Sequence, residues 1–243
     1  MSINNHRHIS VSDIDIYIDR KKIKNLHIGV YPPYGRVRVA TPLHIDDEAV
    51  RLAVISRLVW IRREIKNFQS QPRESKREMI SGESHYLFGK RYLLDVVYGT
   101  KKFEIIEHHS KLELRVREKT TIKNRQLLLN DYYRKQLKKE VTKLISKYEK
   151  IMNLKVNHWE IKKMKTKWGS CTPTTKRILI NLELVKKPIE CIEYIVVHEM
   201  VHLLERKHND IFKSYLDRYL PLWKQYKDRL NNTLLGFDEW YIK

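Results

Sequence analysis

The sequence predicts an α+β protein with a β-rich first half and a helical second half. Short stretches of alternating or clustered β-branched and aromatic residues dominate up to about residue 120. From about residue 122 the apolar residues follow helical spacing. No low-complexity linker separates the halves. We therefore expect two lobes, residues 1–120 and 121–243, without a flexible boundary between them.

The first lobe is expected to hold two groups of strands separated by one helix. The first group, within residues 14–42, comprises "IDIYID", "LHIGVY" and "RVRVATP". Residues 46–68 place apolar side chains near helical spacing and predict a single helix. A second β-rich stretch follows, with short turns that predict an antiparallel meander: "HYLFG", "RYLLDVVYG", "KFEIIEHH" and "KLELRVRE".

The second lobe begins with a long amphipathic helix that has a basic outer face, from about residue 122 to 152. Two strands should then flank the turn "KWGSCTPTTK", namely "VNHWEIKKM" and "RILINLEL". Pro188 occupies the first turn of a predicted helix over 189–205, since proline is favoured there. A further helix over 210–219 should be capped by Asn209 or Asp210.

The chain is strongly basic, with 49 Lys and Arg against 29 Asp and Glu and a formal net charge of +20. Such an excess favours polyanionic partners, although cations spread along a chain are also typical of a solvated surface. No stretch reaches the roughly 18 apolar residues of a membrane span. A polar start and two cysteines, Cys171 and Cys191, predict a cytoplasmic protein with reduced thiols.

The stretch "YIVVHEMVHLLERKH", residues 194–208, is apolar but carries three histidines and a glutamate. His198 and His202 are four residues apart, so a helix places both on one face, about 6 Å apart along the axis. Buried imidazoles require polar partners, and a metal ion is a suitable one. Glu199 is rotated by about 100° from His198 and can instead reach a water on the metal. This is the His-Glu-x-x-His arrangement of zinc hydrolases.

A catalytic zinc ion usually has three protein ligands, so His198 and His202 require one more. His208 follows His202 by six residues, and a short turn after the helix could return it to the metal. Three histidines would leave the fourth position open for water, whose pKa zinc lowers to about 7. The sequence thus predicts one catalytic Zn²⁺, with Glu199 as the general base of a hydrolase.

The chain resembles the YgjP-like metallopeptidases, which are close to the SprT-like and minimal gluzincin proteases. The resemblance covers most of the sequence and rests chiefly on two segments found together, "VVHEMVHLLERKHNDIF" and "KMKTKWGSC". It implies a zincin-like lobe with an active-site helix and a small antiparallel sheet. His198, His202 and His208 would be ligands and Glu199 the base. The strand over 178–184 would be an edge strand beside the cleft, where a peptide substrate could bind.

Three further residues have two interpretations each. Glu205 could accept a hydrogen bond from a ligand histidine, or it could be a solvated carboxylate at a helix end. Trp168 and Ser170 could line the cleft. Alternatively, Trp168 packs the turn against the core and Ser170 caps a strand end.

Two functions from different classes fit these observations. The first is a zinc-dependent metallopeptidase that acts on a protein or peptide. The second is a nucleic-acid-associated protein whose basic segments contact phosphates, such as "RKQLKKE" and "REKTTIKNR", with a structural or inactive zinc. The two also combine in a protease recruited to DNA. The sequence leaves the oligomeric state open.

Overall fold

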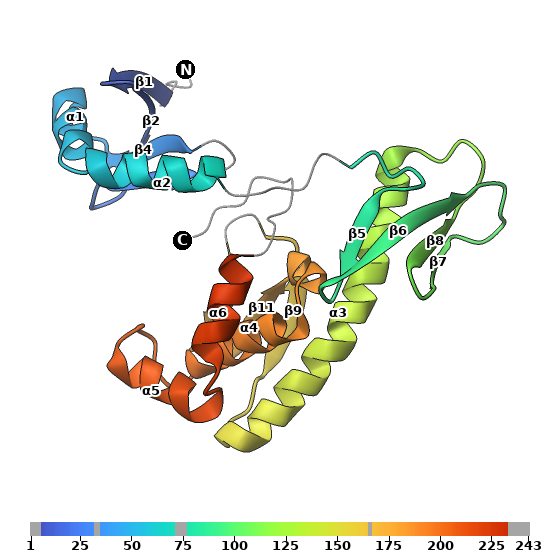
Figure 1. The fold of residues 1–243 in the computed structure, drawn as a ribbon. Helices are drawn as coiled ribbons and strands as arrows, with labels where there is room; N and C mark the ends of the chain where they lie inside the picture. Colours follow the sequence, from blue (N-terminus) through green and yellow to red (C-terminus); the bar gives the residue numbers. More distant parts are fainter. Residues whose placement is uncertain (1–5, 32–34, 71–76, 165–166, 233–243) are drawn as a thin grey trace. The chain divides into compact units, whose positions relative to one another are not determined.

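The computed structural model describes residues 6–31, 35–70, 77–164 and 167–232. Within them the chain forms two compact units, one up to residue 70 and the other from residue 77 onward (Figure 1). The division therefore differs from the boundary at residue 120 that composition suggested. The second β-rich stretch belongs with the helical half because its apolar side chains share one core with the long helix and the histidine-bearing helix.

Unit 1 is a four-stranded sheet followed by two helices. The strands β1 (His6–Val11), β2 (Ile14–Lys21), β3 (His27–Tyr31) and β4 (Arg36–Pro42) pair in the order β1-β2-β4-β3. The β2–β4 pairing is parallel and the other two are antiparallel.

The single helix expected over 46–68 is two helices, α1 (Asp47–Ile55) and α2 (Leu58–Ser70). Asp46 caps α1 by accepting a hydrogen bond from the Ala49 N–H at 2.8 Å. The break follows at Ser56, whose hydroxyl donates to the Ala53 carbonyl at 2.8 Å. Such a bond from a serine side chain competes with the helical ladder and bends the chain.

Unit 2 starts with β5 (Ser84–Leu87), β6 (Lys90–Val97), β7 (Glu104–Glu107) and β8 (Lys111–Arg115). Their order is β5-β6-β8-β7, and β6 pairs with β8 in parallel. The predicted antiparallel meander is therefore wrong. In the parallel arrangement Leu94 lies opposite Leu112, so that buried side chains of both central strands face the core together. This strand order repeats that of unit 1, a likeness with no counterpart in the sequence.

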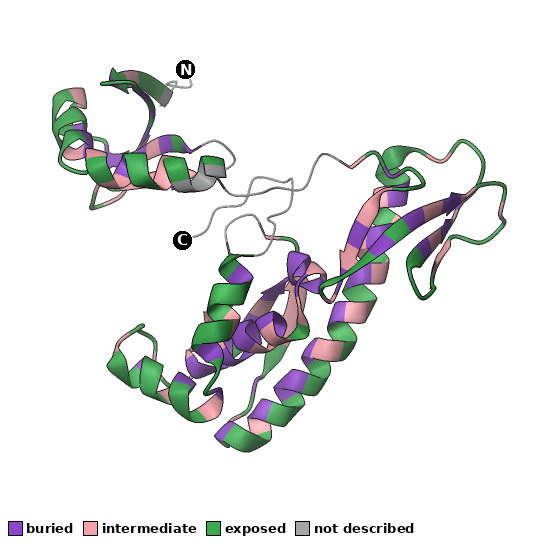
Figure 2. Cartoon of the chain, viewed as in Figure 1, coloured by how far each residue is buried: buried purple, intermediate pink, exposed green. Residues whose placement is uncertain are grey.

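The long helix α3 (Ile122–Met152) has the bounds that its periodicity predicts. Thr121 caps its start by accepting from the Asn124 N–H, and Asn153 ends it in the left-handed conformation. One face is buried along its whole length (Figure 2), and this face comprises Arg125, Leu129, Tyr133, Leu137, Val141, Leu144, Ile145, Tyr148 and Met152. The β5–β8 sheet lies at one end of α3, and the remaining elements lie toward its other end (Figure 1).

The second sheet of unit 2 has the order β10-β11-β9, built from β9 (His158–Lys162), β10 (Gly169–Thr172) and β11 (Arg177–Asn181). The segment expected to be an edge strand over 178–184 is thus the central strand as far as Asn181. Its remainder is a 3₁₀ helix, η1 (Leu182–Lys186), capped by the Asn181 side chain. The edge strands are β9 and β10, and β10 lies in the segment predicted to be a turn.

Three helices complete the unit: α4 (Ile189–Val201), α5 (Asp210–Tyr219) and α6 (Trp223–Asn231). Helix α4 follows Pro188 as predicted, but it ends before the expected residue 205. Asn209 caps α5 by accepting from the Phe212 N–H at 2.9 Å. None of the helices in the described ranges is both long and apolar enough to cross a membrane. The α+β class is confirmed.

Candidate metal centre and active site

Helix α4 brings His198 and Glu199 into its last turn, and His202 is the residue at which it ends. The residues of α4 before His198 are mostly apolar, and the helix is buried on nearly all sides. The ring centroids of His198 and His202 lie 5.0 Å apart. The four-residue spacing therefore places both imidazoles on one face, as the helical period requires.

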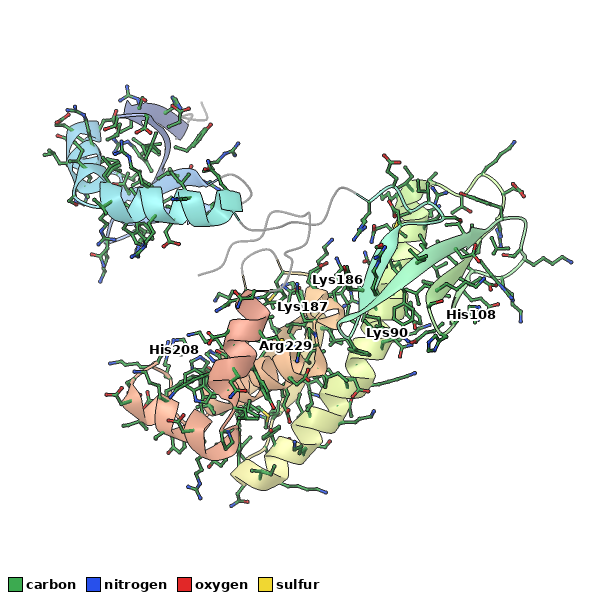
Figure 3. The ribbon with its side chains drawn as sticks, viewed as in Figure 1. Lys90, His108, Lys186, Lys187, His208 and Arg229 are labelled. Carbon is green, nitrogen blue, oxygen red and sulfur yellow. The ribbon has the colours of Figure 1, made fainter. Side chains whose placement is uncertain are left out.

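His208 comes from the segment between α4 and α5 and returns to this face (Figure 3). Its ring centroid is 4.9 Å from that of His198 and 4.7 Å from that of His202. One nitrogen from each ring lies within 4.8 Å of the other two. The chain thus brings together the three histidines that the sequence singled out.

The three imidazoles have the chemistry of a site for a divalent metal ion. His198 Nε2 and His208 Nε2 are 3.0 Å apart, and ligand nitrogens around tetrahedral zinc lie roughly 3.3 Å apart. His202 Nδ1 is 3.2 Å from the Glu205 carbonyl oxygen. It can only donate to that oxygen, which leaves the Nε2 lone pair for a metal.

Burial keeps two of these imidazoles neutral. It lowers the pKa of His198 to about 3, and the neighbouring imidazoles of His202 and His208 further disfavour a charge there. Burial also lowers the pKa of His202 below its ordinary value. A neutral imidazole is the form that binds a metal, so the residues present fit a divalent cation that prefers nitrogen ligands.

Glu199 lies against strand β10. Its exposure is 6%, and burial raises its pKa to about 8, while the charge of Lys167 opposes the rise. A Cβ added to Gly169 would lie 2.6 Å from both Cγ and Oε1 of Glu199. Only glycine therefore permits this approach of strand to helix. Sequence reasoning did not single out Gly169 because it placed this residue in a turn, whereas a glycine within a strand indicates a close backbone approach.

Phe212 is a second residue that sequence reasoning missed. Its ring centroid lies 4.9, 4.7 and 4.8 Å from those of His198, His202 and His208. The phenyl ring is buried and packs against all three imidazoles. The sequence offered one signal for this contact: Phe212 lies in the first turn of α5, three residues after the cap Asn209.

Comparison with known proteins identifies the family of the chain. The profile of the YgjP-like metallopeptidase domain matches residues 24–233. The chain belongs to the YgjP-like metallopeptidase family. A search of curated proteins finds no match. Two similar solved structures are metallopeptidase zymogens, Pyrococcus abyssi abylysin and Methanocaldococcus jannaschii jannalysin. They are 20% and 22% identical, cover 37% and 40% of this chain and 90% and 91% of their own, and have TM-scores of 0.35 and 0.36.

The other candidate residues of this YgjP-like protein lie around the centre. Glu205 follows α4, and its carboxylate accepts a hydrogen bond from the Lys207 N–H at 2.8 Å. The group of Glu205 that contacts His202 is its backbone carbonyl. Trp168 packs against the core beneath the Lys187 ammonium, which is 5.5 Å from its ring centroid. Ser170 is half-buried in β10 opposite Leu179.

Proposed function

We propose that this YgjP-like metallopeptidase is a cytoplasmic enzyme that hydrolyses peptide bonds with one zinc ion, held by His198, His202 and His208. The observation that carries the proposal is the convergence of three imidazoles at the end of α4, the helix that also carries the buried Glu199 carboxylate. Cys171 and Cys191 are both free thiols, in keeping with a reducing compartment.

Zinc bound there would supply Lewis-acid polarisation of the scissile carbonyl and of the attacking water. Glu199 acts as the general base. It takes the proton of that water and delivers it to the leaving amine. Its burial favours proton uptake, because the protein around it disfavours the charged carboxylate. Gly169 fixes the position of the carboxylate through direct contact.

The substrate would bind along the edge strand β10. The outer edge of a terminal strand offers N–H and C=O groups to an extended polypeptide, which can add as a further strand. Strand β10 packs against α4 at Gly169, next to Glu199. Backbone pairing there would bring a peptide bond to the general base with little dependence on its side chains.

Metal content and hydrolysis measured on the same preparations test the proposal. Elemental analysis of the wild type should give about one zinc per chain. Glu199→Gln should retain that zinc and lose casein hydrolysis by at least about 100-fold. His202→Ala and His208→Ala should lose both. Undiminished hydrolysis by purified Glu199→Gln would refute the assignment of the base.

A second candidate function is contact with nucleic acid along α3. Its exposed residues are mostly cations: Lys123, Arg134, Lys135, Lys138, Lys139, Lys143, Lys147 and Lys150. Such a row can follow a phosphate backbone, and its binding would weaken steeply with salt. Fluorescence anisotropy with a DNA duplex tests this candidate. Substituting Lys135, Lys138 and Lys139 by Glu should abolish salt-dependent binding without changing peptidase activity.

A further inference from the structure

Exposed cations surround the proposed catalytic centre. Lys167 precedes β10, Arg206 and Lys207 follow α4, and Lys227 lies on α6. None of the four side chains forms an ion pair with a described residue, whereas Lys213 pairs with Asp210 and Lys224 with Asp217. Among the described residues, the carboxylates near the centre that form no ion pair include those of Glu199, Glu205 and Asp228. A divalent metal on neutral imidazoles would add to the positive excess.

Lys167 approaches the centre from the sheet. It precedes Gly169 by two residues, and Gly169 lies directly against the Glu199 side chain. Its carbonyl accepts a hydrogen bond from Asn181 Nδ2 at 2.7 Å, so its backbone is held to the central strand β11.

Lys227 approaches the centre from α6. Its Nζ lies 6.0 Å from the ring centroid of Trp223. Trp223 stacks on Tyr194 at 6.3 Å, and Tyr194 meets the edge of His198 at 5.7 Å. Strand β10 and helix α6 both pack against α4, so the segment that leads into β10 and helix α6 each carry a cation near the proposed centre.

We infer that the proposed peptidase selects acidic polypeptide segments, with Lys167 and Lys227 contacting Asp or Glu side chains near the scissile bond. The inference rests on the proposed function and gives it a substrate class. Backbone pairing along β10 carries no side-chain preference of its own, so nearby charges decide which segments bind best. Both ammonium groups are exposed, which limits the effect of each to roughly threefold to tenfold in affinity.

Three peptides that share one scissile bond test the preference, with flanking residues that are Asp and Glu, Asn and Gln, or Lys. Two readouts are needed: kcat/KM with the zinc-loaded wild type, and peptide affinity by fluorescence anisotropy with zinc-loaded Glu199→Gln. In both, the acidic peptide should rank first and the basic one last. The ranking should diminish as salt increases, because the charges are exposed to solvent.

The double substitution Lys167→Glu with Lys227→Glu should reverse the order of the three peptides in both readouts. The matched control is Lys101→Glu with Lys102→Glu, which changes net charge equally. These exposed residues lie in the loop between β6 and β7, at the far end of unit 2 from α4 (Figure 1). The control should retain the wild-type order.

The outcomes separate the two proposals. Equal affinity and equal kcat/KM for the three peptides would overturn the charge preference and leave the peptidase intact. A reversed order in the control would also overturn it, because net charge alone would then be responsible. Ranked binding without any cleavage would refute the proposed hydrolysis, while the charge preference would stand as a property of binding.

Discussion

Replacing Gly169 by alanine should disable the proposed general base without removing the metal. The added Cβ would lie 2.6 Å from Glu199 Cγ and Oε1, about 1 Å closer than ordinary contact. The strand and the carboxylate must therefore separate by about that distance. Overpacking of this kind costs about 1–3 kcal/mol of folding stability. A misplacement of about 1 Å in a catalytic group can cost about 100-fold in rate, and we expect a loss of that size in kcat/KM.

The assay compares kcat/KM, zinc content and Tm of Gly169→Ala with those of Gly82→Ala. No atom lies within 4 Å of a Cβ at Gly82, but its φ of +91° strains any other residue. Both variants should therefore be destabilised, whereas only Gly169→Ala should lose activity. Zinc content should be unchanged in both. Wild-type kcat/KM in Gly169→Ala would refute the proposed packing of Glu199 against β10.

Three other predictions concern the ligands and the stability of the fold. Asn209→Ala removes the cap of α5 beside His208, so Tm should fall by the equivalent of about 1 kcal/mol and zinc should dissociate faster in a competition assay, while Asn209→Asp should retain both properties. Burial and then the charge of Arg77 lower the pKa of His85 to about 4 from 6.5. The unfolded chain therefore gains a proton first as pH falls from about 6.5 to 4. Stability should drop by on the order of 3 kcal/mol in urea titrations, and less in His85→Asn. Chelation should lower the Tm of the wild type but not that of His208→Ala, because only the folded chain assembles the three ligands.

The sequence predicted the helices better than the sheets. Long apolar periodicities located α3, and capping residues located α5, because helix signals are local. Strand pairing depends on residues far apart in the chain, and local alternation does not encode it. The parallel β6–β8 pair and the central position of β11 were therefore missed. The break at Ser56 was also missed, since apolar residues continue through it.

The histidines of the candidate site were predictable because their spacing has a geometric meaning on a helix and the following turn. Gly169 and Phe212 were not singled out, although both contact the key side chains. Their importance arises from tertiary packing of β10 and α5 against α4. The contact of Glu205 with His202 runs through a backbone carbonyl, which every residue possesses, so no residue type could reveal it.

Both sheets of unit 2 pack along the single helix α3, which spans 31 residues. Tyr132 of α3 donates to Glu107 of β7, whereas Tyr148, sixteen residues later, donates to Glu193 of α4. Amide hydrogens in the middle of α3 should therefore exchange with solvent only when the whole unit opens. The β5–β8 sheet and the histidine-bearing half both depend on this one helix being intact. The two halves should therefore unfold in one cooperative transition.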